Sequence, residues 1–324
     1  MSVLVYTENW DGKFKKATYE ILSYASEIAK QLNTDVTAIS VGNVDDAELK
    51  TLETYGVTKI LNANNEKLHN FNSRAYATVI SEAVKNTGAK VLVMGNTYTA
   101  RATAPRVAVK LGAGLVSGCV ALPKSTSPFI VKKKAYSGKA YADTEVKAEI
   151  KILTLNQNSF KIIENKKDAA IEAFNVEIPN FDNEKIIEVS KAQGKISVND
   201  AEILVSGGRG LKAAENFKML EEMAEILGPT ATTACSRPIT DLDWRPHSEH
   251  VGQTGKVVAP NLYFAIGISG AIQHLAGVNA SKVIVAINTD KDAPIFEAAD
   301  YGIIGDAFEV MPKLIEELKN FKNQ

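Results

Sequence analysis

The stretch Glu202-Ile203-Leu204-Val205-Ser206-Gly207-Gly208-Arg209-Gly210-Leu211 joins a short apolar run to a glycine-rich turn and the start of a helical pattern. A strand that passes through glycines into a helix is the first half of a βαβ unit, so the stretch predicts an α/β fold. The same alternation continues to the end of the chain. We predict strands over Glu202–Ser206, Thr230–Ala234, Leu262–Ile266, Val283–Ile287 and Gly302–Ile304, and helices over Leu211–Leu227, Ala271–Ala276 and Ala307–Phe321.

The first third of the chain alternates in the same way, which predicts a second parallel sheet with helical crossovers. The expected strands are Val3–Tyr6, Val36–Val41, Lys59–Leu61 and Lys90–Met94, and the expected helices are Ala17–Leu32, Ala47–Tyr55, Ser73–Lys85 and Arg101–Lys110.

The pattern changes after Gly114. Phe129–Ala135 and Val146–Leu155 are expected to form an antiparallel ribbon joined across Ser137-Gly138. The predicted fold class is therefore α/β, with two Rossmann-like domains. Each has a mostly parallel sheet with flanking helices, and the first carries the added antiparallel ribbon.

A chain of 324 residues is long enough for two domains, each with its own core. The polar stretch Asn175–Asn199 is the best candidate for a linker, so we expect domains over 1–190 and 200–324. The formal net charge of −1 hides an asymmetry: residues 200–324 carry 11 Lys and Arg against 17 Asp and Glu, and residues 1–199 carry 26 against 21. Halves of −6 and +5 suggest two domains with different roles.

Several classes of protein are excluded by composition. The sequence contains no basic stripe interleaved with aromatic residues and no apolar run of about 20 residues, so we expect neither nucleic-acid binding nor membrane insertion. The N-terminus enters a strand-like run without a signal peptide, which favours the cytoplasm. Cys119 and Cys235 are too few and too far apart for a zinc or iron–sulfur site, so we expect two buried thiols and no metal.

The candidate chemistry lies in turns that follow strands, because ligands of open α/β sheets bind at the carboxyl ends of strands. The turn Gly207–Gly210 suits either a tight turn or an anion site, and the sequence leaves both open. Only six of the 37 basic residues are Arg, and three of these, Arg209, Arg237 and Arg245, are in the C-terminal half. An arginine in a turn suggests bidentate recognition of an anion, although Arg245 also fits a surface ion pair.

Two further segments of the C-terminal half carry reactive side chains. The long irregular segment Cys235–Pro260 holds His247 and His250, which we interpret as solvated histidines because a third metal ligand is missing. The segment Gly267–His274 is similar to the G-x-S-x-G nucleophile elbow, but no histidine follows it at the required distance. A hydrolase is therefore excluded, and we expect Ser269 to cap a helix and to help bind an anion.

Together these motifs closely resemble the alpha subunit of electron-transfer flavoprotein. The resemblance covers residues 202–321 and is looser in the first domain. It departs from the usual pattern of the family between Pro238 and His250, where Asp243, Arg245 and the two histidines are unusual. It rests on Ser206–Leu211, Cys235–Arg237, Val251–Lys256, Gly267–Gly277, Ala286–Asn288 and Ala299–Gly302.

The resemblance implies that the C-terminal domain binds FAD. Arg237 would lie over the isoalloxazine ring, Thr254 would hydrogen-bond near its N5, and His274 would approach its C2 carbonyl. A cation and a histidine there would stabilise the negative charge that arrives with one electron. The phosphates and ribityl chain would be held by Arg209, Ser236, Ser269, Gly270 and Gln273, the adenosine end by Asn288 and Asp306, and the rest of the cofactor site would be lined by Val251, Gly252, Gln253, Ala271, Ile272 and Ala307.

The resemblance also implies partners. The chain would be half of a heterodimer with an electron-transfer flavoprotein beta subunit. It would be an electron carrier rather than an enzyme, moving single electrons in fatty acid β-oxidation. Its donors would be flavoprotein dehydrogenases of the acyl-CoA dehydrogenase type, and its acceptor an electron-transfer flavoprotein quinone oxidoreductase. Two alternatives remain open, a non-catalytic adenine-nucleotide-binding module and an NADH-linked electron-bifurcating flavoprotein.

Overall fold

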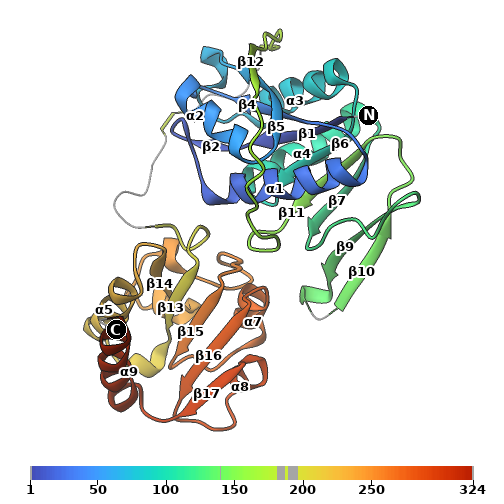
Figure 1. Ribbon diagram of the computed structural model, residues 1–324. Helices are drawn as coiled ribbons and strands as arrows, with labels where there is room; N and C mark the ends of the chain where they lie inside the picture. Colours follow the sequence, from blue (N-terminus) through green and yellow to red (C-terminus); the bar gives the residue numbers. More distant parts are fainter. Residues whose placement is uncertain (1, 139, 181–186, 189–195, 323–324) are drawn as a thin grey trace. The chain divides into compact units, whose positions relative to one another are not determined.

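The structure is a computed structural model that describes residues 2–138, 140–180, 187–188 and 196–322 (Figure 1). The chain forms two compact units, Met1–Val189 and Ser190–Gln324. Part of the predicted linker 175–199, namely 181–186 and 189–195, lies outside the described residues.

The first unit is built on a large sheet in which seven consecutive strands are parallel. The predicted strands are confirmed, and Val36–Val41 has the expected bounds. The parallel part of the sheet runs in the order β7 (Gly114–Cys119), β11 (Lys151–Leu155), β6 (Ala89–Gly95), β1 (Ser2–Thr7), β4 (Val36–Val41), β5 (Val57–Ala63) and β12 (Ala170–Ala173).

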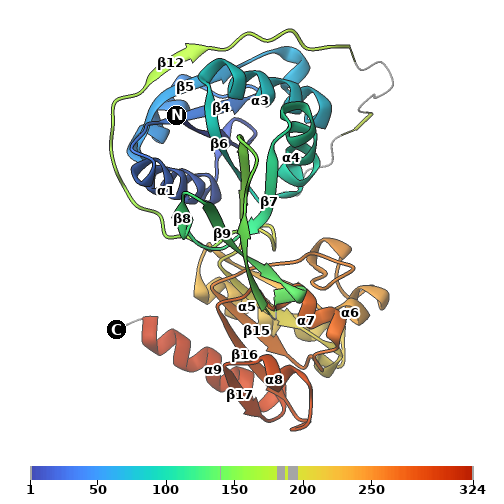
Figure 2. The ribbon, with the colours of Figure 1, turned by 90° about the vertical axis from the view of Figure 1, so that its right-hand side faces the viewer.

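Helices cover both faces of this sheet. Val3 and Val5 of β1 pack in one core with α1 (Lys16–Gln31), and Leu4 and Tyr6 pack in the other with α3 (Ser73–Thr87) and α4 (Tyr98–Leu111). Figure 2 shows α1 on one side of the sheet and α3 and α4 on the other. Burial on both faces explains why the parallel strands are continuous apolar runs. The smaller elements are β2 (Asn9–Trp10), β3 (Lys13–Phe14), α2 (Asp46–Lys50) and the 3₁₀ helices η1 (Thr51–Thr54), η2 (Glu66–Leu68) and η3 (Tyr136–Gly138).

The antiparallel ribbon exists, but its predicted second strand is wrong. β9 (Phe129–Ala135) pairs with β10 (Ala140–Glu145) and with the short β8 (Ser125–Thr126). Lys151–Leu155 instead forms β11, which lies between β6 and β7 in parallel register. Ile152 and Leu153 are both fully buried, as expected for a central parallel strand rather than for a ribbon with one solvated face.

The second unit has a five-stranded parallel sheet. The strand order places the second strand of the unit beside the first and the third on its other side, as in flavodoxin-like folds. The order reverses at the first strand, so its carboxyl end and that of the third strand form the topological switch point. In sheet order the strands are β14 (Ala231–Cys235), β13 (Ile203–Gly207), β15 (Leu262–Ile266), β16 (Val283–Asn288) and β17 (Tyr301–Ile304).

Helices flank this second sheet as well. One core contains side chains of α5 (Lys218–Leu227) and α9 (Ala307–Lys322), and the other contains side chains of α7 (Ile272–Val278) and α8 (Ile295–Ala298). The predicted helix Leu211–Leu227 is wrong in its first half, because Lys212 has a positive φ of 66° that a helix does not allow. Two 3₁₀ turns, η4 (Arg209–Leu211) and η5 (Ala214–Phe217), precede α5, and the irregular segment holds α6 (Arg237–Asp241) and η6 (His247–Glu249).

Candidate functional site

The glycine-rich turns after β13 and β15 meet at the topological switch point. The N–H of Gly208 donates to the carbonyl of Ile266 at 2.9 Å, and the N–H of Gly210 donates to that of Gly267 at 3.1 Å. A Cβ on Gly208 would lie 2.3 Å from the Gly267 oxygen, so a side chain there would force the turns apart. The glycines thus create a tight junction of two backbones where ligands of such sheets bind.

The turn after β15 leaves backbone donors available. Among the described residues, the N–H groups of Ser269, Gly270 and Ala271 donate to no other group, whereas the Ser269 carbonyl accepts from Ile295 N at 3.0 Å. Gly270 has a φ of 84° and a Cβ there would lie 2.3 Å from Ile295 N. Successive N–H groups in such a turn suit the oxygens of a phosphate. The residues present therefore fit an anionic cofactor.

Ser236 and Arg237 follow β14 at the same end of the sheet. Ser236 immediately precedes α6, and Arg237 is the first residue of that helix. The Arg237 side chain is 62% exposed and lies 3.4 Å from Thr254 Oγ1 and 3.5 Å from Asp241 Oδ2. An exposed guanidinium at a strand end can approach a ligand face without breaking a core contact.

The turn that contains Thr254 is joined to the start of α7. Gln253 N donates to the carbonyl of Gln273 at 2.7 Å, and Gly252 N donates to that of Lys256 at 3.1 Å. A Cβ on Gly277 would lie 2.5 Å from the Cα of Gly252, so the turn and the helix are in close backbone contact. The structure therefore brings the predicted segments Val251–Thr254 and Ser269–His274 together.

His274 is buried, at 6% exposure, and both of its ring nitrogens have partners. Nε2 lies 2.9 Å from the phenol oxygen of Tyr263, and Nδ1 lies 3.1 Å from the carbonyl oxygen of Val251. Burial lowers the pKa of His274 to about 4, so the imidazole is neutral at pH 7. Sequence reasoning missed Tyr263, which reads as one more apolar residue of a buried strand.

The interpretation of both loop histidines as solvated is wrong for His250, which is 6% exposed and packs against the backbone at Gly255. Burial, together with the nearby charges of Arg237 and His247, lowers the pKa of His250. Neutral histidine can bind metal, but the described residues contain no group of three or more His, Cys, Asp or Glu arranged to hold an ion. Cys119 and Cys235 are both buried free thiols, as predicted.

Arg245 is not a surface ion pair. Its side chain is 14% exposed, and Nε and Nη2 donate to the two carboxylate oxygens of Glu249 at 2.8 and 2.9 Å. Nη1 donates to Glu221 Oε1 at 2.8 Å, Nη2 also reaches Thr233 Oγ1 at 3.1 Å, and the guanidinium lies over the ring of Phe217 at 5.3 Å. Although burial works to lower it, the hydrogen bonds to the two glutamates raise the pKa of Arg245.

The residues predicted for the adenosine end are Asn288, the last residue of β16, and Asp306, which follows β17, and each has a local partner. The Asn288 amide donates to the Ile268 carbonyl at 2.9 Å, so it ties β16 to the turn after β15. Asp306 accepts from Phe308 N at 3.0 Å and from Lys212 Nζ at 3.3 Å, and these bonds lower the pKa of Asp306. Ala307, the first residue of α9, is buried, and Arg209 is exposed on η4.

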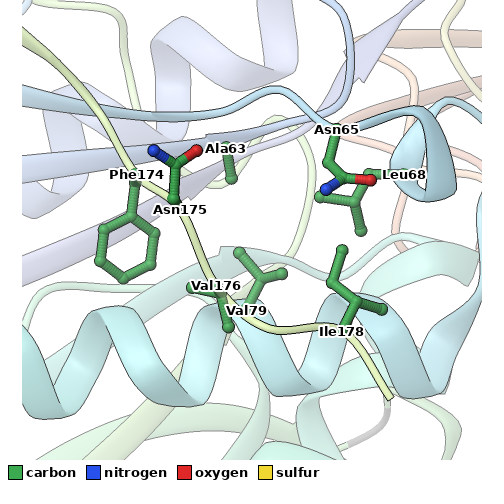
Figure 3. A pocket seen from close by; sticks show the side chains of 8 residues that line it. All are labelled: Ala63, Asn65, Leu68, Val79, Phe174, Asn175, Val176 and Ile178. Carbon is green, nitrogen blue, oxygen red and sulfur yellow. The ribbon is translucent and has the colours of Figure 1, made fainter. Parts of the chain in front are cut away.

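The first unit has a different character. Thr97 caps α4 by accepting from Ala100 N at 3.1 Å. A hollow of about 40 Å³ lies beside β5 and α3, lined mainly by apolar side chains (Figure 3). Ligand pockets are usually of ~300 Å³ or more, so this hollow has room for water molecules only. No helix within the described ranges is both long and apolar enough to cross a membrane.

Comparison with known proteins assigns both halves to one family. Residues 3–179 match the electron transfer flavoprotein domain, and residues 197–279 match the electron transfer flavoprotein FAD-binding domain. Electron transfer flavoprotein subunit alpha of Thermoanaerobacterium thermosaccharolyticum is 36% identical over 99% of this chain and 98% of its own length. The Bacillus subtilis subunit alpha is 35% identical over 98% and 97%. A probable mitochondrial subunit alpha of Caenorhabditis elegans is 37% identical over 98% and 93%.

Proposed function

The chain belongs to the electron transfer flavoprotein alpha-subunit family, and from this premise we propose that it carries single electrons between a flavoprotein dehydrogenase and a quinone oxidoreductase. Its cofactor is FAD. The observation that carries the proposal is the junction of glycine turns and free N–H groups at the switch point, beside the exposed Arg237. We propose that the domain 200–324 holds the cofactor there.

The predicted site residues form two groups, according to the part of FAD that they would contact. The first group would contact the phosphates and the ribityl chain. Arg209 is exposed beside the junction of Gly208 and Gly267, where its guanidinium can pair with a phosphate. Ser236, Ser269 and Gly270 would supply hydroxyl and backbone donors just after β14 and β15, the strands on either side of β13, and Gln273 would supply a side-chain amide from α7.

Arg237 and Thr254 form the second group and would meet the isoalloxazine. FAD, when bound, supplies the one-electron chemistry, and this chain orients it and balances its charge. The Arg237 guanidinium remains positive at any physiological pH, so it favours a negatively charged ring. The Thr254 hydroxyl, 3.4 Å from Arg237, can donate or accept a hydrogen bond at the ring edge.

The first unit serves, in this proposal, as a scaffold that packs against the beta subunit and binds no nucleotide of its own. We place the heterodimer in the cytoplasm, with acyl-CoA dehydrogenases as donors in β-oxidation.

The test is to co-express the chain with its beta subunit and to measure bound FAD. We expect a yellow complex with one FAD per heterodimer. Arg209→Ala should weaken FAD about 10- to 100-fold, as the loss of a charge-assisted hydrogen bond predicts. Arg106→Ala, which removes another exposed arginine, should leave FAD affinity unchanged. A colourless complex that FAD does not restore would contradict the proposal.

Anaerobic titration then separates the electron routes. Reduction of the bound FAD by a reduced acyl-CoA dehydrogenase, and not by NADH, is the result expected of the carrier. Rapid reduction by NADH would instead identify an electron-bifurcating flavoprotein. FAD that binds but accepts electrons from neither donor would favour the non-catalytic nucleotide module.

A further inference from the structure

Lys212 lies at a strained point of the turn that follows β13. Its φ of 66° and ψ of −32° fall outside the regions that residues with a side chain normally adopt. The N–H of Ala213 donates to the carbonyl of Leu211 at 2.7 Å, so Lys212 is the central residue of a tight γ-turn. Glycine adopts a positive φ without steric cost, so a lysine at this position indicates that its side chain is needed there.

The ammonium group of Lys212 reaches the start of α9. Nζ donates to Asp306 Oδ2 at 3.3 Å and lies 4.6 Å from the centre of the Phe308 ring. Both side chains of this ion pair are partly exposed, 66% for Lys212 and 36% for Asp306. Because an isolated pair of this exposure adds little to stability, stability alone does not explain a strained lysine here.

Asp306 is also held by its own helix. Its Oδ1 accepts from Phe308 N at 3.0 Å, which caps α9, while its Oδ2 accepts from Lys212. The N–H of Gly305 donates to the Asn288 carbonyl at 3.0 Å, so both residues predicted for the adenosine end lie on adjoining backbone segments. A carboxylate has about four lone-pair sites, so Asp306 can still accept from the hydroxyls of a ribose.

The turn that carries Lys212 belongs to a different part of the predicted cofactor site. Gly210, two residues earlier, donates its N–H to the Gly267 carbonyl at 3.1 Å, next to the turn where the phosphates would lie. In sheet order β15 and β16 separate β13 from β17. The contact between Lys212 and Asp306 therefore joins segments that follow non-adjacent strands, and these segments would hold the phosphates and the adenosine.

We propose that Lys212 is a positioning residue for the adenosine half of FAD. Its ammonium group holds Asp306 in the orientation that accepts from the adenosine ribose, and it ties the start of α9 to the turn after β13. The inference rests on the proposed FAD site. It gives Lys212 a part in the selection of FAD over FMN, because FMN has no adenosine to meet Asp306.

The experiment measures the affinity of the cofactor-free heterodimer for FAD and for FMN by fluorescence titration. Lys212→Met keeps the length of the side chain and removes its charge, so it should weaken FAD about 3- to 10-fold and leave FMN unchanged. Lys212→Arg keeps the charge and should restore most of the affinity for FAD. The matched control is Lys319→Met, which removes a lysine paired with Glu222 at 2.7 Å in the same unit and should change neither affinity.

A double variant tests whether Lys212 acts through Asp306. Asp306→Ala should weaken FAD, and the addition of Lys212→Met should cause no further loss, because residues that act through one another are coupled. Additive losses would overturn the positioning role, as would an FAD affinity of Lys212→Met equal to the wild type. Equal weakening of FAD and FMN would also overturn it, since the effect would not be specific to the adenosine.

The proposed function and the role of Lys212 fail in different ways. A wild-type heterodimer that binds neither FAD nor FMN would refute the proposed FAD site. A wild-type heterodimer that binds FAD tightly, with Lys212→Met indistinguishable from it, would refute only the role of Lys212. In urea unfolding without cofactor we expect equal midpoints for Lys212→Met and Lys319→Met, and a midpoint lowered only in Lys212→Met would assign the lysine a structural role instead.

Discussion

Replacement of Arg245 by Ala should destabilise the second unit strongly. The guanidinium bonds to both oxygens of Glu249, to Glu221 and to Thr233, and it lies over Phe217. These partners come from β14, the start of α5 and the irregular segment, so Arg245 joins three parts of the unit. Loss of the arginine would leave Glu249, whose side chain is 15% exposed, without its counter-charge.

The magnitude follows from the burial of the partners. Removing one member of a buried ion pair typically costs ~3–5 kcal/mol, mostly because the other charge is left unpaired. Glu221 is 37% exposed and can be rehydrated, so we expect a loss of about 2–4 kcal/mol in the free energy of unfolding. Arg245→Lys keeps the charge but loses the two-pronged geometry, and should cost about half as much.

The assay is urea unfolding followed by tryptophan fluorescence. The two tryptophans lie in different units, Trp10 in the first and Trp244 beside Arg245 in the second. In a Trp10→Phe background the signal therefore reports the second unit alone, and the free energy is extrapolated to zero urea.

The matched control is Lys319→Ala, which breaks an ion pair with Glu222 in the same unit. Those side chains are 52% and 49% exposed, so the control should cost less than about 1 kcal/mol. The reasoning is refuted if Arg245→Ala unfolds at the same urea concentration as the control.

Three further changes have defined outcomes. Gly208→Ala should abolish FAD retention, measured by absorbance of the purified complex, because the new Cβ would lie 2.3 Å from the Gly267 oxygen. Asp306→Ala should lower stability at pH 7 but not at pH 2, measured by urea unfolding, since a depressed carboxyl pKa stabilises the fold above the ordinary value of 3.8 and loses this effect as pH falls through the folded pKa. Cys119 and Cys235, whose pKa burial raises to about 12, should react with iodoacetamide only after unfolding, measured by mass spectrometry.

Each of these has a control and a contradicting result. Gly305→Ala, which meets only a side chain at 3.0 Å, should keep FAD, and equal retention in Gly208→Ala would contradict the tight junction. For the Asp306 variant the control is Asp292→Ala, which removes another exposed carboxylate, and an equal loss of stability at pH 7 and pH 2 in Asp306→Ala would contradict the prediction. Rapid labelling of either cysteine in the native protein would show that its thiol is accessible.

The local sequence pattern predicts the positions of individual strands, but it does not predict how they pair. Val36–Val41 and Leu262–Ile266 have the predicted bounds because each is a mainly apolar run bounded by polar or glycine residues. The pairing of β11 was not predictable in this way. Lys151–Leu155 inserts between β6 and β7 after the ribbon, and strand order is set by long-range packing that periodicity does not report.

The same contrast holds for single residues of the site: the sequence shows the residue type, and the structure shows the partner that explains it. Glycines at 208 and 210 are visible in the sequence, but the reason for them is the close approach of Gly267, which lies more than 50 residues further on. Arg245 reads as a surface cation because its partners Glu221 and Thr233 come from other elements. The sequence therefore predicted the segments of the site, and the structure shows which side chains hold those segments together.

The charge near the predicted position of the flavin ring depends on which of the surrounding side chains are ionised. His274 and His250 have pKa values lowered by burial, so both imidazoles are uncharged at pH 7. Arg237, whose guanidinium contacts Thr254, then supplies positive charge beside this turn, and Asp241, 3.5 Å away, offsets part of it. Since exposed pairs are weak, a cofactor that covers Arg237 and excludes water would strengthen its effect at the ring while loosening the pair with Asp241. We therefore expect the potential of the bound flavin to depend on Arg237 more than on His274.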